Sequence, residues 1–210
     1  MSKSSQLDKI NFSSDLSELI NAEFSYIAQT AFQSNEDRAR VSTFYISSIG
    51  SLIAAIVSSQ LFADSTKLSI SNQQGTAYAF AFLFGILFVS GLITVLQLAR
   101  LRLAWFKSVE AMNHLKRFCV EANGTVDLEK VFLWNDSELP HVIDPLSLSL
   151  LLAFQVIMLT SLMFGTCIYY IGIINNSWWL YPAIWSGIFA LIPLFLVYVW
   201  AVQDKLNKKV

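Results

Sequence analysis

Hydrophobic residues fill the second half of the chain almost without interruption. Between Asp144 and Asp204 no residue carries a charge. Such a stretch cannot form a helix at the surface of a protein in water, since no face of it would be polar, and it predicts two membrane-spanning helices. The expected turn is Asn-Asn-Ser at residues 175–177. We assign residues 145–203 to this second transmembrane hairpin and residues 204–210 to a basic cytosolic tail.

The start of the second hairpin has a local signal of its own. Asp144 suits a helix cap, and Pro145 suits the first helical position, where its missing N–H would have no partner in the helix anyway. We therefore expect the third membrane helix over residues 146–174 and the fourth up to residue 202.

Two earlier apolar runs predict a first transmembrane hairpin over residues 41–99. The run over residues 41–63 is long enough, at ~1.5 Å per residue, to cross a hydrocarbon core of ~30 Å. The second run covers residues 75–99, and a short polar connection joins the two. The chain thus has four predicted spans.

An amphipathic pattern over residues 15–40 precedes the first span. Asp15 and Glu18 fit a helix N-terminus, and apolar residues follow at helical spacing. Either this helix continues into the membrane or Ser34 caps a new helix. We favour the continuous helix because no glycine or proline interrupts it. Residues 1–14 are polar, and we expect them to be disordered.

The second span also continues beyond the predicted membrane, into a cytosolic helical segment over residues 100–144. Its apolar residues form one stripe and its charged residues another, and no break signal precedes Asn123 and Gly124. The predicted fold class is therefore an all-α integral membrane protein with four transmembrane helices in two hairpins, in which helices 1 and 2 extend into the cytosol.

Basic residues predict the orientation. Lysines and arginines precede the first span, lie between the second and third, and follow the fourth, whereas the other two loops contain Lys67 alone. The positive-inside rule then places both termini and the segment between the hairpins in the cytoplasm. We expect the chain in a plasma membrane, the inner membrane of a bacterium.

Composition agrees with this class and excludes several functions. The 210 residues are 55% hydrophobic and 14% charged, with a mean hydropathy of +0.53. A net charge of -1 provides no basic field for nucleic acid. No Asp, Glu, Lys, Arg or His lies in a predicted span, and no metal or nucleotide motif occurs. We therefore expect neither an enzyme nor a cofactor or metal.

Small and hydroxyl side chains form a stripe along one face of the first span, which consists of Ser47, Ser51, Ala54 and Ser58. Such residues let membrane helices approach closely, so a helix-packing face is the first interpretation. In a ring of subunits the same stripe would line a narrow polar pore, which is the second. The expected complement in the second span is Ala77, Ala81 and Gly85, and Gly165 and Gly172 mark close approach in the third.

The densest charge group lies just before the first span and consists of Glu36, Asp37, Arg38 and Arg40. One interpretation is a membrane-surface anchor with local ion pairs. The other is a coupling site, in which these charges pair with Arg100, Arg102 or Lys107, or hold a lipid headgroup or small ligand where cytosolic motion enters the membrane.

This layout of transmembrane hairpins with cytosolic helices resembles that of the SLATT family of small bacterial membrane effectors, in which such chains oligomerise. The resemblance concerns the layout and transfers no residue. Together with the serine stripe it favours a homo-oligomeric, pore-forming or channel-like membrane effector gated through its cytosolic helices. The alternative is a non-catalytic membrane scaffold or sensor subunit that binds a cytosolic partner protein.

Overall fold

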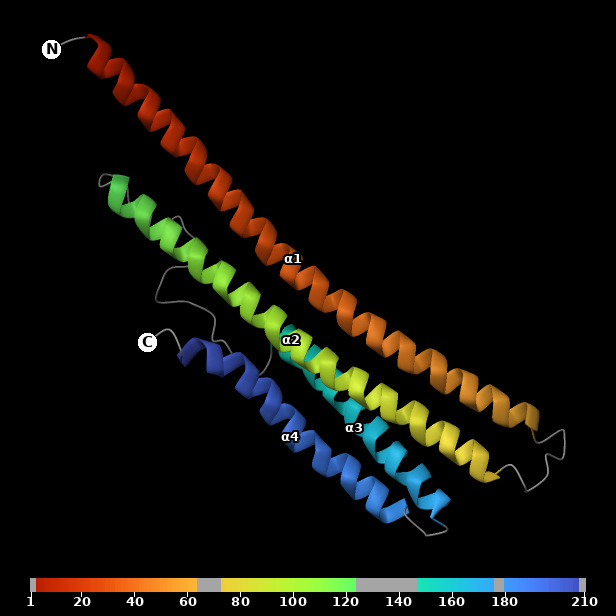
Figure 1. Cartoon of the computed structure of the whole chain (residues 1–210). Helices are drawn as coiled ribbons and strands as arrows, with labels where there is room; N and C mark the ends of the chain where they lie inside the picture. The colour runs from red at the N-terminus through yellow and green to blue at the C-terminus, as the bar shows by residue number, and fades with distance from the viewer. Residues whose placement is uncertain (1–2, 64–72, 124–146, 176–179, 208–210) are drawn as a thin grey trace. The chain divides into compact units, whose positions relative to one another are not determined.

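The computed structural model describes residues 3–63, 73–123, 147–175 and 180–207, and these residues form four helices (Figure 1). The helices are α1 (Lys3–Ala63), α2 (Gln73–Asn123), α3 (Leu148–Ile174) and α4 (Leu180–Asn207). Each is long and apolar enough to cross a membrane. The prediction of an all-helical chain with four such helices is confirmed.

Helices α1 and α2 are both much longer than a membrane span, with 61 and 51 residues. Helix α1 passes through Ser34 without a break, as the absence of glycine and proline predicts. It begins at Lys3 rather than at Asp15. The expected disorder of residues 1–14 stays a prediction. Polar composition limits burial, but it does not by itself prevent a helix from extending.

Helix α3 begins slightly later than the sequence predicts. Its N-cap is Ser147, whose side chain accepts a hydrogen bond from the backbone N–H of Leu150. A serine hydroxyl at this position satisfies one of the free N–H groups of the first turn. The predicted cap Asp144 and its neighbour Pro145 lie outside the described residues, as does Gly124.

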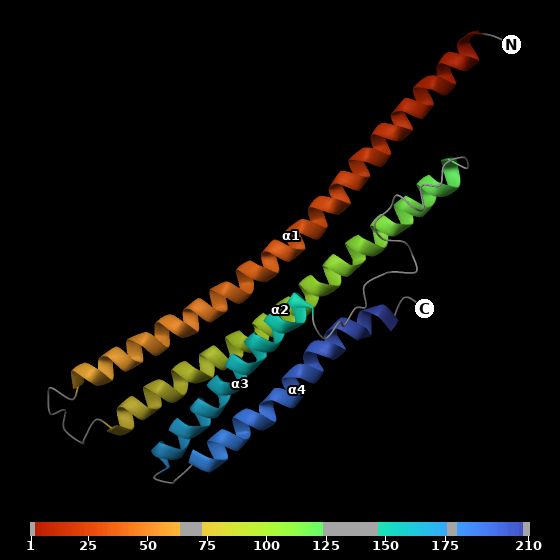
Figure 2. The same cartoon turned by 180° about the vertical axis from the view of Figure 1, so that it is seen from behind.

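The chain divides into two compact units. The extension unit combines Met1–Glu36 with Arg102–Val142, and the four-helix unit combines Asp37–Leu101 with Ile143–Val210. In the four-helix unit, α3 and α4 lie side by side in both views (Figures 1 and 2). Its fully buried side chains come from all four helices and include Ile49, Val95, Val156, Ile157 and Val202.

Aromatic side chains join α2 to α3 within the four-helix unit. Phe80 and Phe84 of α2 both contact Tyr170, and the Phe84 and Tyr170 rings are stacked with centroids 5.7 Å apart. Phe88 meets Phe164 at 4.8 Å, one to two turns farther along the two helices. Pairs at these separations are worth ~0.5–1.5 kcal/mol each beyond the area they bury. The phenylalanines of α2 thus include packing residues as well as exposed ones.

The extension unit contains one buried polar side chain that has no partner among the described residues. Asn113 of α2 is only 5% exposed, and neither its amide nitrogen nor its amide oxygen makes a hydrogen bond there. A buried amide in this state is costly, because it has given up water without replacing it. It lies on the same helix as buried Leu103 and Val109.

Replacing Asn113 with leucine should therefore stabilise the extension unit by about 1–3 kcal/mol, the cost of leaving such a group unsatisfied. The measurement is amide hydrogen exchange over residues 102–121, which should slow. The control is Asn35→Leu in the same unit, where the side chain is exposed and exchange should hardly change. Faster exchange in Asn113→Leu would show that the amide is satisfied in solution.

Candidate functional site

Helix α1 has two contrasting faces in the four-helix unit. Its buried face contains Arg38, Ser42, Tyr45 and Ile49, which recur at intervals of three or four residues. The four residues of the predicted serine stripe are exposed instead. The candidate site is this helix. One face packs inside the four-helix unit, and the other is exposed.

Tyr45 anchors the buried face through its hydroxyl. The hydroxyl oxygen lies 3.0 Å from Oγ1 of Thr160 on α3 and 3.4 Å from the backbone carbonyl oxygen of Leu87 on α2. Thr160 donates to the carbonyl of Val156 at 2.7 Å. Either hydroxyl could donate in the bond between Tyr45 and Thr160, and Tyr45 has only one proton for that bond and for the carbonyl of Leu87. Three helices thus meet at one hydrogen-bond network.

Gly91 makes this meeting possible. A Cβ atom built on Gly91 would lie 2.3 Å from both the Tyr45 hydroxyl oxygen and Thr160 Oγ1. Real Cβ atoms do not approach other atoms so closely, so only glycine lets α2 come this near to α1 and α3. No Asp, Glu, Lys, Arg or His in the apolar runs points to this network. Neutral hydroxyls in those runs were the available signal, since they too need partners in an apolar environment.

Arg38 is part of the buried face of α1. Its side chain is only 7% exposed and donates a hydrogen bond to the hydroxyl of Ser149 in the first turn of α3. The guanidinium group therefore connects α1 to the start of α3. The interpretation of the charge group as a membrane-surface anchor stays a prediction.

The other members of the charge group fall into both units. Asp37, Arg40 and Arg100 belong to the four-helix unit, and Glu36 and Arg102 belong to the extension unit. Arg102 is buried, with its guanidinium 4.9 Å from the ring centroid of Trp105, which is a cation–π contact. The predicted pairing of the acidic residues with Arg100 or Arg102 stays a prediction.

The outer face of α1 consists of small side chains that nothing else in the unit covers. Ser47, Ser51, Ala54 and Ser58 are all exposed, and a Cβ on neighbouring Gly50 would meet nothing within 4 Å. The Ser51 hydroxyl donates to the carbonyl of Ser48 at 3.0 Å, which satisfies it within the helix. On α2, the backbone carbonyl of Ala81 accepts a hydrogen bond from Cys167 of α3, and a Cβ on Gly85 would lie 3.8 Å from that sulfur. The predicted pairing of this face with the serine stripe stays a prediction.

The other helices expose large side chains over the same apolar stretches. Those of α4 include Ile184, Trp185, Ile188, Phe189 and Trp200. Those of α2 include Phe82, Ile86 and Ile93. Bulky apolar residues are suited to contact with lipid tails, whereas small residues are typical of contacts between helices. Helix α1 also exposes Phe44 and Ile53, so the small side chains form one strip of its exposed surface.

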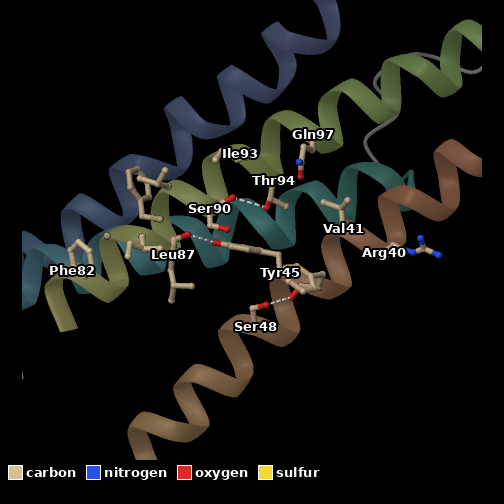
Figure 3. A pocket seen from close by; sticks show the side chains of 15 residues that line it. Arg40, Val41, Tyr45, Ser48, Phe82, Leu87, Ser90, Ile93, Thr94 and Gln97 are labelled. Atoms are coloured by element: carbon tan, nitrogen blue, oxygen red, sulfur yellow. Dashed lines mark hydrogen bonds between the residues drawn. The ribbon is translucent and has the colours of Figure 1, made fainter. Parts of the chain in front are cut away.

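A groove of about 1050 Å³ lies between α1 and α2 in the four-helix unit (Figure 3). Val41 and Tyr45 line it from α1, and Leu87, Ser90 and Thr94 line it from α2. The described residues contain no group of three or more His, Cys, Asp or Glu side chains that would hold a metal ion. The polar atoms at the groove are hydroxyl and amide groups with one guanidinium.

No family model, curated protein or solved structure matches this chain. The layout shared with the SLATT family stays a resemblance. The functional argument therefore rests on the two faces of α1 and on the groove beside it.

Proposed function

We propose that this protein is an integral membrane protein whose copies assemble through the outer face of α1 into a channel-like pore. Four spans would form two hairpins, with both termini and the central segment on the cytoplasmic side of a plasma membrane, the inner membrane of a bacterium. The function is non-catalytic. The single observation that supports it most is the exposure of the small, hydroxyl-rich face of α1.

The physical argument concerns what such a face does in a bilayer. Lipid tails are as apolar as leucine, so helices associate in lipid through close packing and hydrogen bonds rather than through the hydrophobic effect. Small residues permit that close approach, and the single chain leaves them uncovered. A second copy would cover them. In a ring of copies, Ser47, Ser51 and Ser58 would place hydroxyl groups one above another along the axis.

The gating part of the proposal rests on the continuity of α1. The helix runs without a break from Lys3 to Ala63, so the same helix contributes residues to both units. A partner protein or small ligand that moves the extension unit would therefore move the serine face as well. Helix ends and loops absorb motion more readily than the interior of a helix. No helix end or loop interrupts α1 between its extension and the serine stripe.

Replacing Ser51 with leucine should abolish ion flux through protein reconstituted in liposomes, because the larger side chain would occupy a narrow pore or prevent its assembly. The control is Ile53→Leu, also exposed on α1 but outside the stripe, which should retain flux. The mass of the detergent-solubilised protein should be a multiple of the single chain. A strictly monomeric protein without flux would overturn the proposal.

A cysteine at position 51 separates a pore from a dry packing face. In a chain whose Cys119 and Cys167 are replaced by alanine, Ser51→Cys should react with a membrane-impermeant thiol reagent, which should block the flux. A thiol that stays unmodified in an oligomer would mean that the face packs helices together without lining water.

A non-catalytic scaffold or sensor subunit is the second candidate, and one observation favours it. The extension unit exposes several aromatic rings, among them Phe24, Tyr26, Phe32 and Phe118. Aromatic side chains are enriched where proteins bind partners. A monomeric protein without flux that binds one cytosolic protein in fixed stoichiometry, and loses it in Phe32→Ala, would favour this function.

A further inference from the structure

The groove between α1 and α2 has the chemistry of a site for an amphiphile. Its volume of about 1050 Å³ is slightly above the ~300–1000 Å³ typical of ligand sites. Its rims include Phe44 and Phe82, which are 76% and 73% exposed. A ligand would therefore enter sideways, past exposed apolar side chains, which is the route open to a molecule dissolved in the bilayer.

The lining changes from polar to apolar along the groove. Arg40 and Gln97 mark one end, and Thr94 and Ser90 follow toward the centre, whereas Phe82 lies at the opposite end (Figure 3). Arg40 is exposed, and Figure 3 shows its guanidinium directed outward from that end rather than into the centre. A cation at the mouth and an apolar channel behind it are complementary to an anionic head with a hydrocarbon tail.

We propose that this groove binds an anionic phospholipid from the surrounding bilayer, with the phosphate at Arg40 and Gln97 and one acyl chain along the groove toward Phe82. The proposal rests on the membrane insertion proposed above, but not on a pore or on oligomers. Arg40 also ends the charge group and directly precedes the first apolar run of the sequence. It lies three residues after Asp37, the first residue of the four-helix unit on α1.

The test is native mass spectrometry of the detergent-solubilised protein, titrated separately with phosphatidylglycerol and phosphatidylcholine. We expect each chain to retain one phosphatidylglycerol several times more tightly than phosphatidylcholine. Arg40→Gln should weaken phosphatidylglycerol binding about fivefold and remove the preference, since one basic residue near anionic lipid contributes about that factor. Arg100→Gln is the matched control, because Arg100 is exposed but does not line the groove, and it should leave binding unchanged.

A second pair of variants tests the tail end of the site. Ser90→Phe should fill the groove and reduce retention of both lipids, whereas Ile188→Phe, on the exposed face of α4, should not. Equal binding of the two lipids together with no effect of Arg40→Gln would overturn the proposal. A second outcome would also overturn it. If the parent protein binds no lipid and Ser90→Phe loses its oligomers, a second copy of the chain occupies the groove instead. Lipid retention by a chain that conducts no ions would support this site while contradicting the pore.

Discussion

Replacing Gly91 with alanine should destabilise the four-helix unit by about 1–3 kcal/mol, the usual cost of an extra carbon in a packed interior. The added Cβ would lie 2.3 Å from the Tyr45 hydroxyl oxygen and 2.6 Å from Thr160 Cγ2. The Tyr45 hydroxyl lies at the far end of a long side chain and can move away from the added Cβ. Cγ2 of Thr160 is bonded directly to the Cβ of that residue, so it has much less room to move. Relieving that contact requires α2 and α3 to separate, which would also disturb the stacked rings of Phe84 and Tyr170.

Thermal denaturation in detergent, followed by circular dichroism, measures this effect. The matched control is Gly50→Ala, where a Cβ meets nothing within 4 Å. Alanine is favoured over glycine inside a helix by ~0.8–1.0 kcal/mol, so the control should be neutral or slightly stabilising. Two similar melting temperatures would show that the three helices do not meet closely at Gly91.

A second substitution at Tyr45 distinguishes steric overlap from a general loss of helix contacts. Tyr45→Phe removes the hydroxyl that a Cβ on Gly91 would meet, although it also removes the hydrogen bond to Thr160. The two changes should therefore be less destabilising together than the sum of the single variants. Additive effects would mean that residues 45 and 91 do not interact.

The elements that the sequence predicts well are those that depend on local pattern alone. Long apolar runs without charge define the helices, and the missing glycine or proline near Ser34 determines that α1 continues. The start of α1 at Lys3 was not predictable from polarity, since a polar segment joined to a stable helix can extend it through backbone hydrogen bonds alone. Helix α3 begins at Leu148 rather than at the predicted residue 146. Its start depends on one interaction, the hydrogen bond from the N–H of Leu150 to the side chain of Ser147.

The candidate site was predictable only in part. The sequence shows that small side chains share one face of the first span, but it does not show whether that face turns inward or outward. That choice depends on the rotation of α1 about its axis, which is set by Tyr45 and Ile49 on the opposite face. The network of Tyr45 with Thr160 joins residues 115 positions apart, and no local pattern specifies such a pair.

The sequence predicts that another helix approaches α3 closely at Gly165. That helix is α4, and the contact gives the second strong prediction. A Cβ on Gly165 would lie 2.8 Å from the backbone carbonyl oxygen of Ala183. Gly187 is the next small residue along that face of α4, and a Cβ there would lie 3.2 Å from the carbonyl oxygen of Ser161. Two helix backbones are thus almost in contact, as small residues at four-residue spacing permit.

Replacing Gly165 with alanine should therefore separate α3 from α4 and cost about 1–3 kcal/mol, because a backbone carbonyl cannot turn aside as a side chain can. Gly187→Ala should cost less, since its closest contact is longer, and Gly75→Ala should cost nothing, since a Cβ there meets nothing within 4 Å. Hydrogen exchange of the α3 amides in detergent measures all three variants on one scale. We expect exchange to be fastest in Gly165→Ala, slower in Gly187→Ala and slowest in Gly75→Ala. An equal rate for Gly165→Ala and Gly75→Ala would contradict a backbone contact, and α3 and α4 would then be held by their larger side chains instead.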